Sequence, residues 1–427
     1  MLALYTQSVD SALLLAAVKE KYYAGEDADL FYISATTDEV AIIRQLKKAD
    51  IFCNIYIIDY PSALQPTDGR FGKIPKLRKV MFSWAIYDYF QFFLREYTQG
   101  KQYSRLIVPH LGDCVQYIAY FFTKNDPKLE ICFYGEGTDP YRNRTGQYLG
   151  HWGAKPKSKK DRVMNWVGEK KYLKPLRRYA KPIFYLQMPD RNQVDPWFQE
   201  LHEIPSLLEF PHIFDLLRKA ADELPLHLKT AYSRRRAVFF ASAYAENQNN
   251  LVKFVGMGRD GDAFQALVLM FGMRGVLMRP VQGLPLNREF LGLNAEQHDG
   301  LFVDRLCFHN SLTPLLCTAP DRLILVGNDP GMMAQSKLLF HNEPYLVFTY
   351  LVTGKADPGF DAFVSNLRKA YQRPEKIAVP ATAEELEEAL IACRNDLYDR
   401  IYPKCENVAE EGADYDSILC PFKSNIN

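Results

Sequence analysis

The feature that most constrains the fold is the alternation of short apolar segments with helical stretches in the first third of the chain. The apolar segments span residues 2–5, 29–34, 54–58, 105–109 and 130–134, and helical stretches at 39–48 and 79–97 separate some of them. Strands that are short and apolar throughout, with helices between them, are typical of parallel βαβ units. The sequence therefore predicts an α/β fold.

A second pattern of the same kind follows a basic triplet at 234–236. Strands are expected at 237–241, 251–255, 275–278, 323–326 and 345–349, with a helix at 262–271. A further helix is expected to begin at Thr382, because Thr382 and Glu385 form a capping box. Its apolar face carries Leu386, Ala389, Leu390, Cys393 and Leu397.

Two α/β halves predict two Rossmann-like lobes with a ligand cleft between them and helices at the C-terminus. We expect an N-terminal lobe at 1–150 and a basic, aromatic-rich linker or insertion at 151–230. A C-terminal lobe at 231–375 and a helical segment at 376–427 complete the predicted organisation.

The charge distribution is uneven although the total is nearly balanced. Fifty-two Lys and Arg against 51 Asp and Glu give a net charge of +1, which argues against a nucleic-acid-binding protein. Residues 155–181 nevertheless hold eleven basic and two acidic residues, and residues 384–416 hold eleven acidic and three basic ones. The basic block suits an anionic membrane surface, with Trp152, Trp166 and Tyr172 at the interface, or equally a solvated linker.

The cysteines and the apolar runs indicate the compartment. None of the eight cysteines forms a Cys-x-x-Cys pair, so we expect reduced thiols and no zinc site. No apolar run reaches the roughly 18 residues that span a membrane. The sequence predicts a cytoplasmic protein that can lie on the inner face of the membrane.

The first candidate site follows the strand at 130–134. Glu136 stands between Gly135 and Gly137, so its carboxylate is expected to be exposed where a general base needs to be. The alternative is a glycine-rich turn with an incidental glutamate. Among the histidines, His110 and His309 are best placed for a cleft, although a lone histidine is more often structural.

A second candidate is the Gly-x-Gly-x-x-Gly pattern at 256–261, which follows the expected strand 251–255. Arg279, at the end of the next strand, would suit the 2′-phosphate of NADP. A plain loop is the competing interpretation. The pair Asp27 and Asp29 precedes a strand and is interpreted as a solvated turn rather than a metal site.

The third candidate is the Gly/Asn/Pro loop at 327–331 with the helix that follows it. Backbone amides at such a helix start can hold a phosphate, and the alternative is an ordinary βα turn. The predicted nucleotide-binding residues are Gly327, Asn328, Gly331, Ser336 and Lys337.

In these motifs the chain resembles the bacterial sialyltransferases and polysialyltransferases of GT-B type. The resemblance rests on the opening strand and loop through Gln7, on 134–138 with Tyr141, and on the block 325–344. The family carries an acidic-acidic-Gly motif, a His-Pro motif and a Ser/Thr-rich nucleotide loop. At these places the chain has Gly135-Glu136-Gly137, Arg279-Pro280 and Asp329-Pro330-Gly331.

The resemblance implies an inverting transfer of sialic acid or a related acidic sugar from a CMP-activated donor to a glycan or glycolipid of the capsule or lipooligosaccharide. It implies no metal and no cofactor, Glu136 as the base in the N-terminal lobe, and Arg279 as the contact to the departing phosphate. The residues expected to line the acceptor side or the cleft are Gln7, His110, Gly135, Gly137, Thr138, Tyr141 and His309.

Two alternatives remain at this point, and a homodimer is left open. The first is a NADP-binding oxidoreductase that uses the loop 256–261. The second is a non-catalytic relative that binds a glycan or a nucleotide, because its motifs differ from those of the family.

Overall fold

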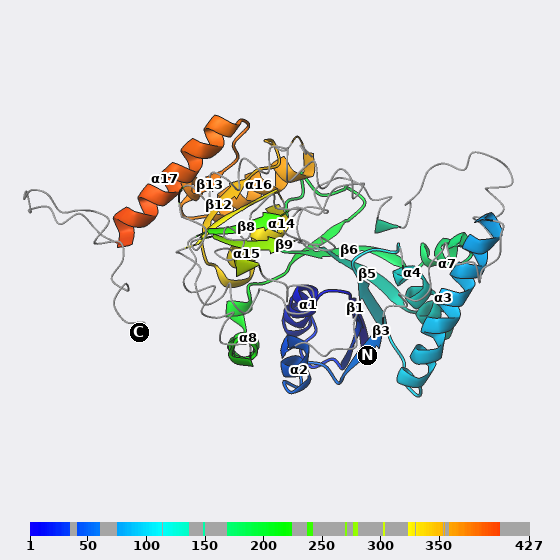
Figure 1. Ribbon diagram of the computed structural model, residues 1–427. Helices are drawn as coiled ribbons and strands as arrows, with labels where there is room; N and C mark the ends of the chain where they lie inside the picture. Colours follow the sequence, from blue (N-terminus) through cyan, green and yellow to red (C-terminus); the bar gives the residue numbers. More distant parts are fainter. Residues whose placement is uncertain are drawn as a thin grey trace, which may run out of the picture.

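The computed structural model shows an α/β protein whose described residues form two parallel β-sheets (Figure 1). The structure describes residues 1–34, 41–59, 75–112, 114–135, 148–149, 169–223, 237–241, 270, 276–280, 302–303, 323–328, 330–352, 354 and 358–401. Everything said below about structure concerns these residues.

The first sheet has seven strands in the described part of the chain, in the order β3-β2-β1-β4-β5-β6-β7, and every pairing is parallel. The strands are β1 (Leu2–Thr6), β2 (Ala28–Ser34), β3 (Asn54–Asp59), β4 (Arg105–Val108), β5 (Glu130–Gly135), β6 (Ala180–Leu186) and β7 (Glu200–Glu203). The five strands expected before residue 135 are confirmed to within two residues at each end.

Helices cover both faces of this sheet. One face is covered by α1 (Val9–Tyr22), α2 (Ala41–Lys47) and α8 (Pro211–Glu223), and the other by α3 (Pro75–Tyr97), α4 (Val115–Asn125) and α7 (Glu169–Leu176). Successive side chains of a strand point to opposite faces, so Leu4 and Tyr5 enter different cores, and both are fully buried. This explains why the strands are apolar throughout instead of alternating.

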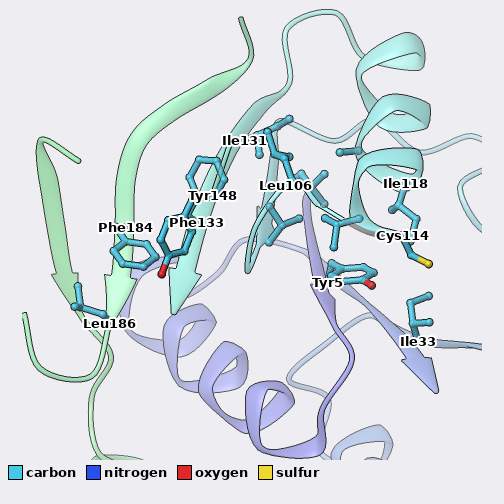
Figure 2. Close-up of a cluster of buried hydrophobic side chains, with 14 of the residues drawn as sticks. Tyr5, Ile33, Leu106, Cys114, Ile118, Ile131, Phe133, Tyr148, Phe184 and Leu186 are labelled. Atoms are coloured by element: carbon cyan, nitrogen blue, oxygen red, sulfur yellow. The ribbon is translucent and has the colours of Figure 1, made fainter. Parts of the chain in front are cut away.

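Aromatic side chains fill the core between the sheet and α4. Figure 2 shows Phe133, Tyr148 and Phe184 gathered on one side of this core, with Ile118 entering from α4. Phe184 stacks on Phe198 with 4.4 Å between ring centroids, and Tyr148 meets Phe184 edge-on at 5.1 Å. Such ring pairs each contribute about 0.5–1.5 kcal/mol beyond their buried area.

The second sheet has the order β10-β9-β8-β11-β12-β13 in the described residues, again entirely parallel. Its strands are β8 (Ala237–Ala241), β9 (Val276–Pro280), β10 (Phe302–Val303), β11 (Ile324–Gly327), β12 (Tyr345–Phe348) and β13 (Ile377–Ala378). The helical elements here are α14 (Pro330–Met333), α15 (Gln335–Phe340), α16 (Pro358–Ala370), the 3₁₀ turn η7 (Pro374–Lys376) and α17 (Ala383–Ile401). Two Rossmann-like lobes are therefore confirmed.

The predicted boundary of the first lobe at residue 150 is wrong. Strands β6 and β7 come from the segment expected to be a linker, and they extend the first sheet. The β5–β6 ladder shifts register between Ile131 and Phe133, opposite the part of β6 that contains Pro182. Proline has no N–H to donate to a strand ladder, so a proline in a basic segment argues against a strand at the level of the sequence. The irregular pairing is how the sheet accommodates it.

The C-terminal helix follows the sequence pattern closely. The Glu385 amide donates to Thr382 Oγ1 at 3.2 Å, and the Glu385 carboxylate accepts from the Ala381 amide at 2.7 Å. Leu386, Leu390, Cys393 and Leu397 are buried as expected. None of the helices in the described ranges combines the length and the apolar composition that crossing a bilayer requires.

Asp29 is not part of a solvated turn, as the sequence suggested. It lies in β2 and is fully buried. Its carboxylate accepts hydrogen bonds from Lys101 Nζ at 2.6 Å, the Tyr103 hydroxyl at 2.6 Å and Asn54 Nδ2 at 2.8 Å. These partners come from β3 and from the segment before β4, so Asp29 links β2 to the neighbouring β3 and, across β1, to the start of β4 at the amino edge of the sheet.

We expect Asp29→Ala to lower the free energy of unfolding towards the lower end of the about 3–5 kcal/mol typical of a broken buried ion pair, since Lys101 is one-fifth exposed. Urea denaturation measures this change. The control is Asp27→Ala, which removes an exposed carboxylate two residues earlier and should change stability by less than about 0.5 kcal/mol. Equal effects of the two substitutions would show that the buried network is not stabilising.

Candidate functional site

The strand order locates the functional edge of each lobe. In the first sheet the connecting helices change faces between the neighbouring strands β1 and β4. The helix α1, which follows β1, packs on one face, and α4, which follows β4, packs on the other. Ligands of open parallel sheets bind at the carboxyl ends of the strands at such a switch point. Gln7 follows β1 and His110 lies two residues beyond β4, so these two predicted cleft residues flank the switch point.

Side chains at this switch point form hydrogen bonds within their own chain segments. His110 Nδ1 accepts a hydrogen bond from the Gly112 amide at 3.0 Å, so the neutral imidazole carries its proton on Nε2. Ser8 Oγ accepts from the Ser11 amide at 3.0 Å and caps α1. Gln7 is exposed and its amide donates to the Tyr5 hydroxyl.

Gly135 ends β5 at the same carboxyl edge and is buried. The motif residues that follow it in the sequence, Glu136, Gly137, Thr138 and Tyr141, lie outside the described residues, as does His309. Their predicted roles therefore stay predictions.

In the second lobe the switch point lies between β8 and β11. Because β8 is the first strand of this sheet, a dinucleotide fingerprint would be expected directly after Ala241. The Gly-x-Gly-x-x-Gly pattern at 256–261 comes later in the sequence and lies outside the described residues. Gly327 and Asn328, in contrast, stand at the end of β11 and border this switch point.

Arg279 lies within a strand rather than beyond its end. The strand expected at 275–278 is observed as Val276–Pro280, because its parallel pairing with β8 continues through Phe240 opposite Arg279 and Ala241 opposite Pro280. Arg279 is thus the penultimate residue of β9, close to the carboxyl edge of the second sheet.

The helix expected after the loop 327–331 is divided into two short helices. Ala334 separates α14 from α15. Gly331 lies in α14 and is buried. The helix that follows the loop is thus the four-residue α14, and the predicted phosphate contact at its start stays a prediction.

Lys337, which the sequence assigns to the nucleotide-binding set, forms an ion pair. Its Nζ lies 2.6 Å from Glu343 Oε1 and 5.5 Å from the centre of the Tyr371 ring. Burial alone would raise the pKa of Glu343, but hydrogen bonds from Lys337 and from the Gln372 and Arg373 amides outweigh it and hold the pKa below its ordinary value. Lys337 and Glu343 therefore stabilise the turn after α15 and its contact with the end of α16.

The carboxyl edges of the two sheets meet along α15. Gln187, directly after β6, donates through Nε2 to Gln335 Oε1 at 3.3 Å. Ser206 Oγ donates to the Leu339 carbonyl at 2.9 Å. Leu339 and Phe340 belong to the apolar core of the first lobe although they come from the second. We call this region the lobe junction and define it by Gln187, Asn328, Gln335, Ser336 and Thr349.

Buried polar atoms without hydrogen-bond partners collect at the lobe junction. Within the described ranges, seven buried side-chain N or O atoms have no such partner, and four of them are Gln187 Oε1, Asn328 Nδ2, Ser336 Oγ and Thr349 Oγ1. The four residues are at least nine-tenths buried. Each such atom costs about 1–3 kcal/mol, so their recurrence in α15 and just after β6, β11 and β12 makes these strand ends a candidate site for a polar ligand.

The junction residues carry no formal charge, and this limits what they can recognise. Amide and hydroxyl groups donate and accept hydrogen bonds, so they suit a nucleobase edge or sugar hydroxyl groups better than a phosphate. Asn328 and Ser336 belong to the predicted nucleotide-binding set. Gln187, Gln335 and Thr349 were missed, although Gln187 and Thr349 directly follow apolar strands, which is the signal that identified Asn328.

Comparisons with known proteins leave the family undetermined. No family model and no curated protein matches the chain. A UDP-N-acetylglucosamine 2-epimerase structure aligns with 94% of this chain and 89% of its own at 10% identity and a TM-score of 0.48. Phytolacca americana UGT2 complexed with UDP-2fluoro-glucose and pterostilbene aligns with 98% and 97% at 9% identity and a TM-score of 0.44.

A third structure, E. coli heptosyltransferase WaaC with ADP-2-deoxy-2-fluoro heptose, aligns with 93% of this chain and 99% of its own at 13% identity and a TM-score of 0.37. Because all three TM-scores lie below 0.5, the fold assignment rests on the chain's own strand orders.

We expect Thr349→Val to raise the free energy of unfolding of the unliganded chain by about 1 kcal/mol, because it removes a buried hydroxyl without a partner and keeps the shape of the side chain. Thr123→Val is the matched control. Thr123 is also buried, but its hydroxyl donates to the Tyr120 carbonyl at 3.1 Å, so this change should be destabilising. Urea denaturation measures both changes. A Thr349→Val variant that loses stability like the control would contradict the assignment of the Thr349 hydroxyl as a buried group without a partner.

Proposed function

We propose that the chain is a glycosyltransferase that uses a nucleotide-activated sugar. The observation that carries the proposal is the set of uncharged, buried polar groups at the lobe junction, four of whose side-chain atoms have no hydrogen-bond partner in the described residues. An uncharged base and ribose can supply those partners while the sugar extends towards the first lobe.

The finer proposal is an inverting transfer of sialic acid or a related acidic sugar from a CMP-activated donor to a cell-surface glycan. It draws on the resemblance in the motifs around Gly135, Arg279 and Gly327. Arg279 would place a fixed positive charge near the departing phosphate, which CMP needs because it leaves as an anion. Because the lobe junction has no charged side chain, a residue outside it has to neutralise the phosphate. Arg279 lies close to the carboxyl edge of the second sheet.

The chemical step follows from these roles. Glu136 accepts the proton of an acceptor hydroxyl, and the oxygen attacks the anomeric carbon from the face opposite CMP. The bond between the anomeric carbon and the phosphate oxygen breaks, CMP departs with that electron pair, and the configuration inverts. A positioned base of this kind contributes about 10²–10⁴-fold in rate.

We expect Glu136→Gln to lower the rate of transfer by about 10²–10⁴-fold and to leave the affinity for CMP unchanged, because the amide keeps the shape but cannot take the proton. Release of CMP from CMP-sialic acid in the presence of a glycan acceptor measures the rate, and calorimetric titration measures the affinity. The control is Glu26→Gln, an exposed carboxylate before β2 at the opposite edge of the first sheet. Near wild-type turnover of the Glu136→Gln variant would refute the role of the base.

A further inference from the structure

The outer surface of α3 exposes large apolar side chains. Four large hydrophobic residues are exposed among those that the structure describes, and three of them, Met81, Trp84 and Phe92, belong to α3. At 3.6 residues per turn they fall within about 80° of arc on one side of the helix. Trp84 is 42% exposed and Met81, one turn earlier, is 38% exposed. Helices that cover a sheet normally turn such residues inward.

Helix α7 presents a basic surface beside this apolar one. Tyr172, Leu173 and Leu176 form its buried side, and Tyr172 packs against Tyr87 of α3 with 4.8 Å between ring centroids. Figure 1 shows α3 and α7 together at the end of the first lobe that lies away from the second sheet. Tyr172 is therefore a core residue, and its predicted place at a membrane interface is wrong.

The outward side of α7 and the residues after it are basic. Lys171, Lys174, Arg177 and Arg178 are exposed. Lys171 Nζ lies 5.6 Å from the centre of the Trp84 ring, so the cationic and apolar surfaces are continuous. Within α7 itself, three lysines stand against one glutamate. We define the α3–α7 patch by Met81, Trp84, Lys171, Lys174 and Arg177.

We propose that the α3–α7 patch binds the surface of an anionic lipid bilayer. Tryptophan favours the interface between lipid headgroups and acyl chains, and lysine and arginine are attracted to anionic headgroups around it. A patch that offers both, on the rim of a lobe, matches a bilayer surface in chemistry.

The proposal does not depend on the proposed glycosyl transfer, because none of the patch residues belongs to the lobe junction. It does bear on where such an enzyme would work. In a parallel α/β sheet the connecting helices run antiparallel to the strands, so the first half of α3, with Met81 and Trp84, lies towards the carboxyl edge that carries Gln7 and His110.

The test is co-sedimentation of the full chain with vesicles of phosphatidylcholine, and with vesicles of phosphatidylcholine mixed with phosphatidylserine, at low and high salt. We expect binding to the mixed vesicles at low salt, weaker binding at high salt and little binding to phosphatidylcholine alone. The double substitution Lys171→Ala and Lys174→Ala should lower the partition coefficient about fivefold for each charge removed. Trp84→Ala should lower it as well.

Two matched controls separate the patch from a general surface effect. Leu208→Ala removes a side chain that is also 42% exposed, in the 3₁₀ turn η3 (Leu207–Glu209), and Lys48→Ala removes an exposed charge after α2. Thermal unfolding checks that every variant is folded. Equal binding to both kinds of vesicle, equal losses in the patch variants and the controls, or no sedimentation with any vesicle would each overturn the proposal.

Discussion

Both sheets are parallel throughout their described strands, and a parallel sheet has to be covered by helices on both faces. The first sheet meets this requirement with α1, α2 and α8 on one side and α3, α4 and α7 on the other. Once both faces are closed, the strand ends are where a ligand can reach the backbone. The position of the candidate site therefore follows from the burial of the sheets.

The lobe junction is where this arrangement leaves polar groups without partners. Three further buried atoms lack a hydrogen-bond partner elsewhere in the described residues, whereas the buried Asp29 is paired by Lys101, Tyr103 and Asn54. At the junction, Ser336 and Thr349 keep buried hydroxyl groups that find no partner in the described residues, at a cost in stability. Buried polar groups without hydrogen-bond partners are expected at functional sites. The contrast with the paired Asp29 makes the lobe junction a candidate ligand site.

Much of the fold could be predicted from the sequence, because buried parallel strands such as β8 are short apolar runs bounded by polar residues. The strand β6 could not, since its Pro182 and basic neighbours look like a linker, and only pairing with β5 reveals it. Tyr172 was misjudged for a related reason. Its place in a basic segment suggested a membrane interface, whereas packing against Tyr87 buries it. Long-range partners are not visible in a local pattern.

The central claim is that the lobe junction binds the nucleotide of a CMP-activated sugar. Hydrogen–deuterium exchange of the full chain, with and without CMP and with and without NADPH, tests it most directly. The account predicts that CMP slows exchange of the amides at 324–328 and 335–340 and that NADPH leaves them unchanged. Unchanged exchange there with CMP, or protection by NADPH instead, would contradict it.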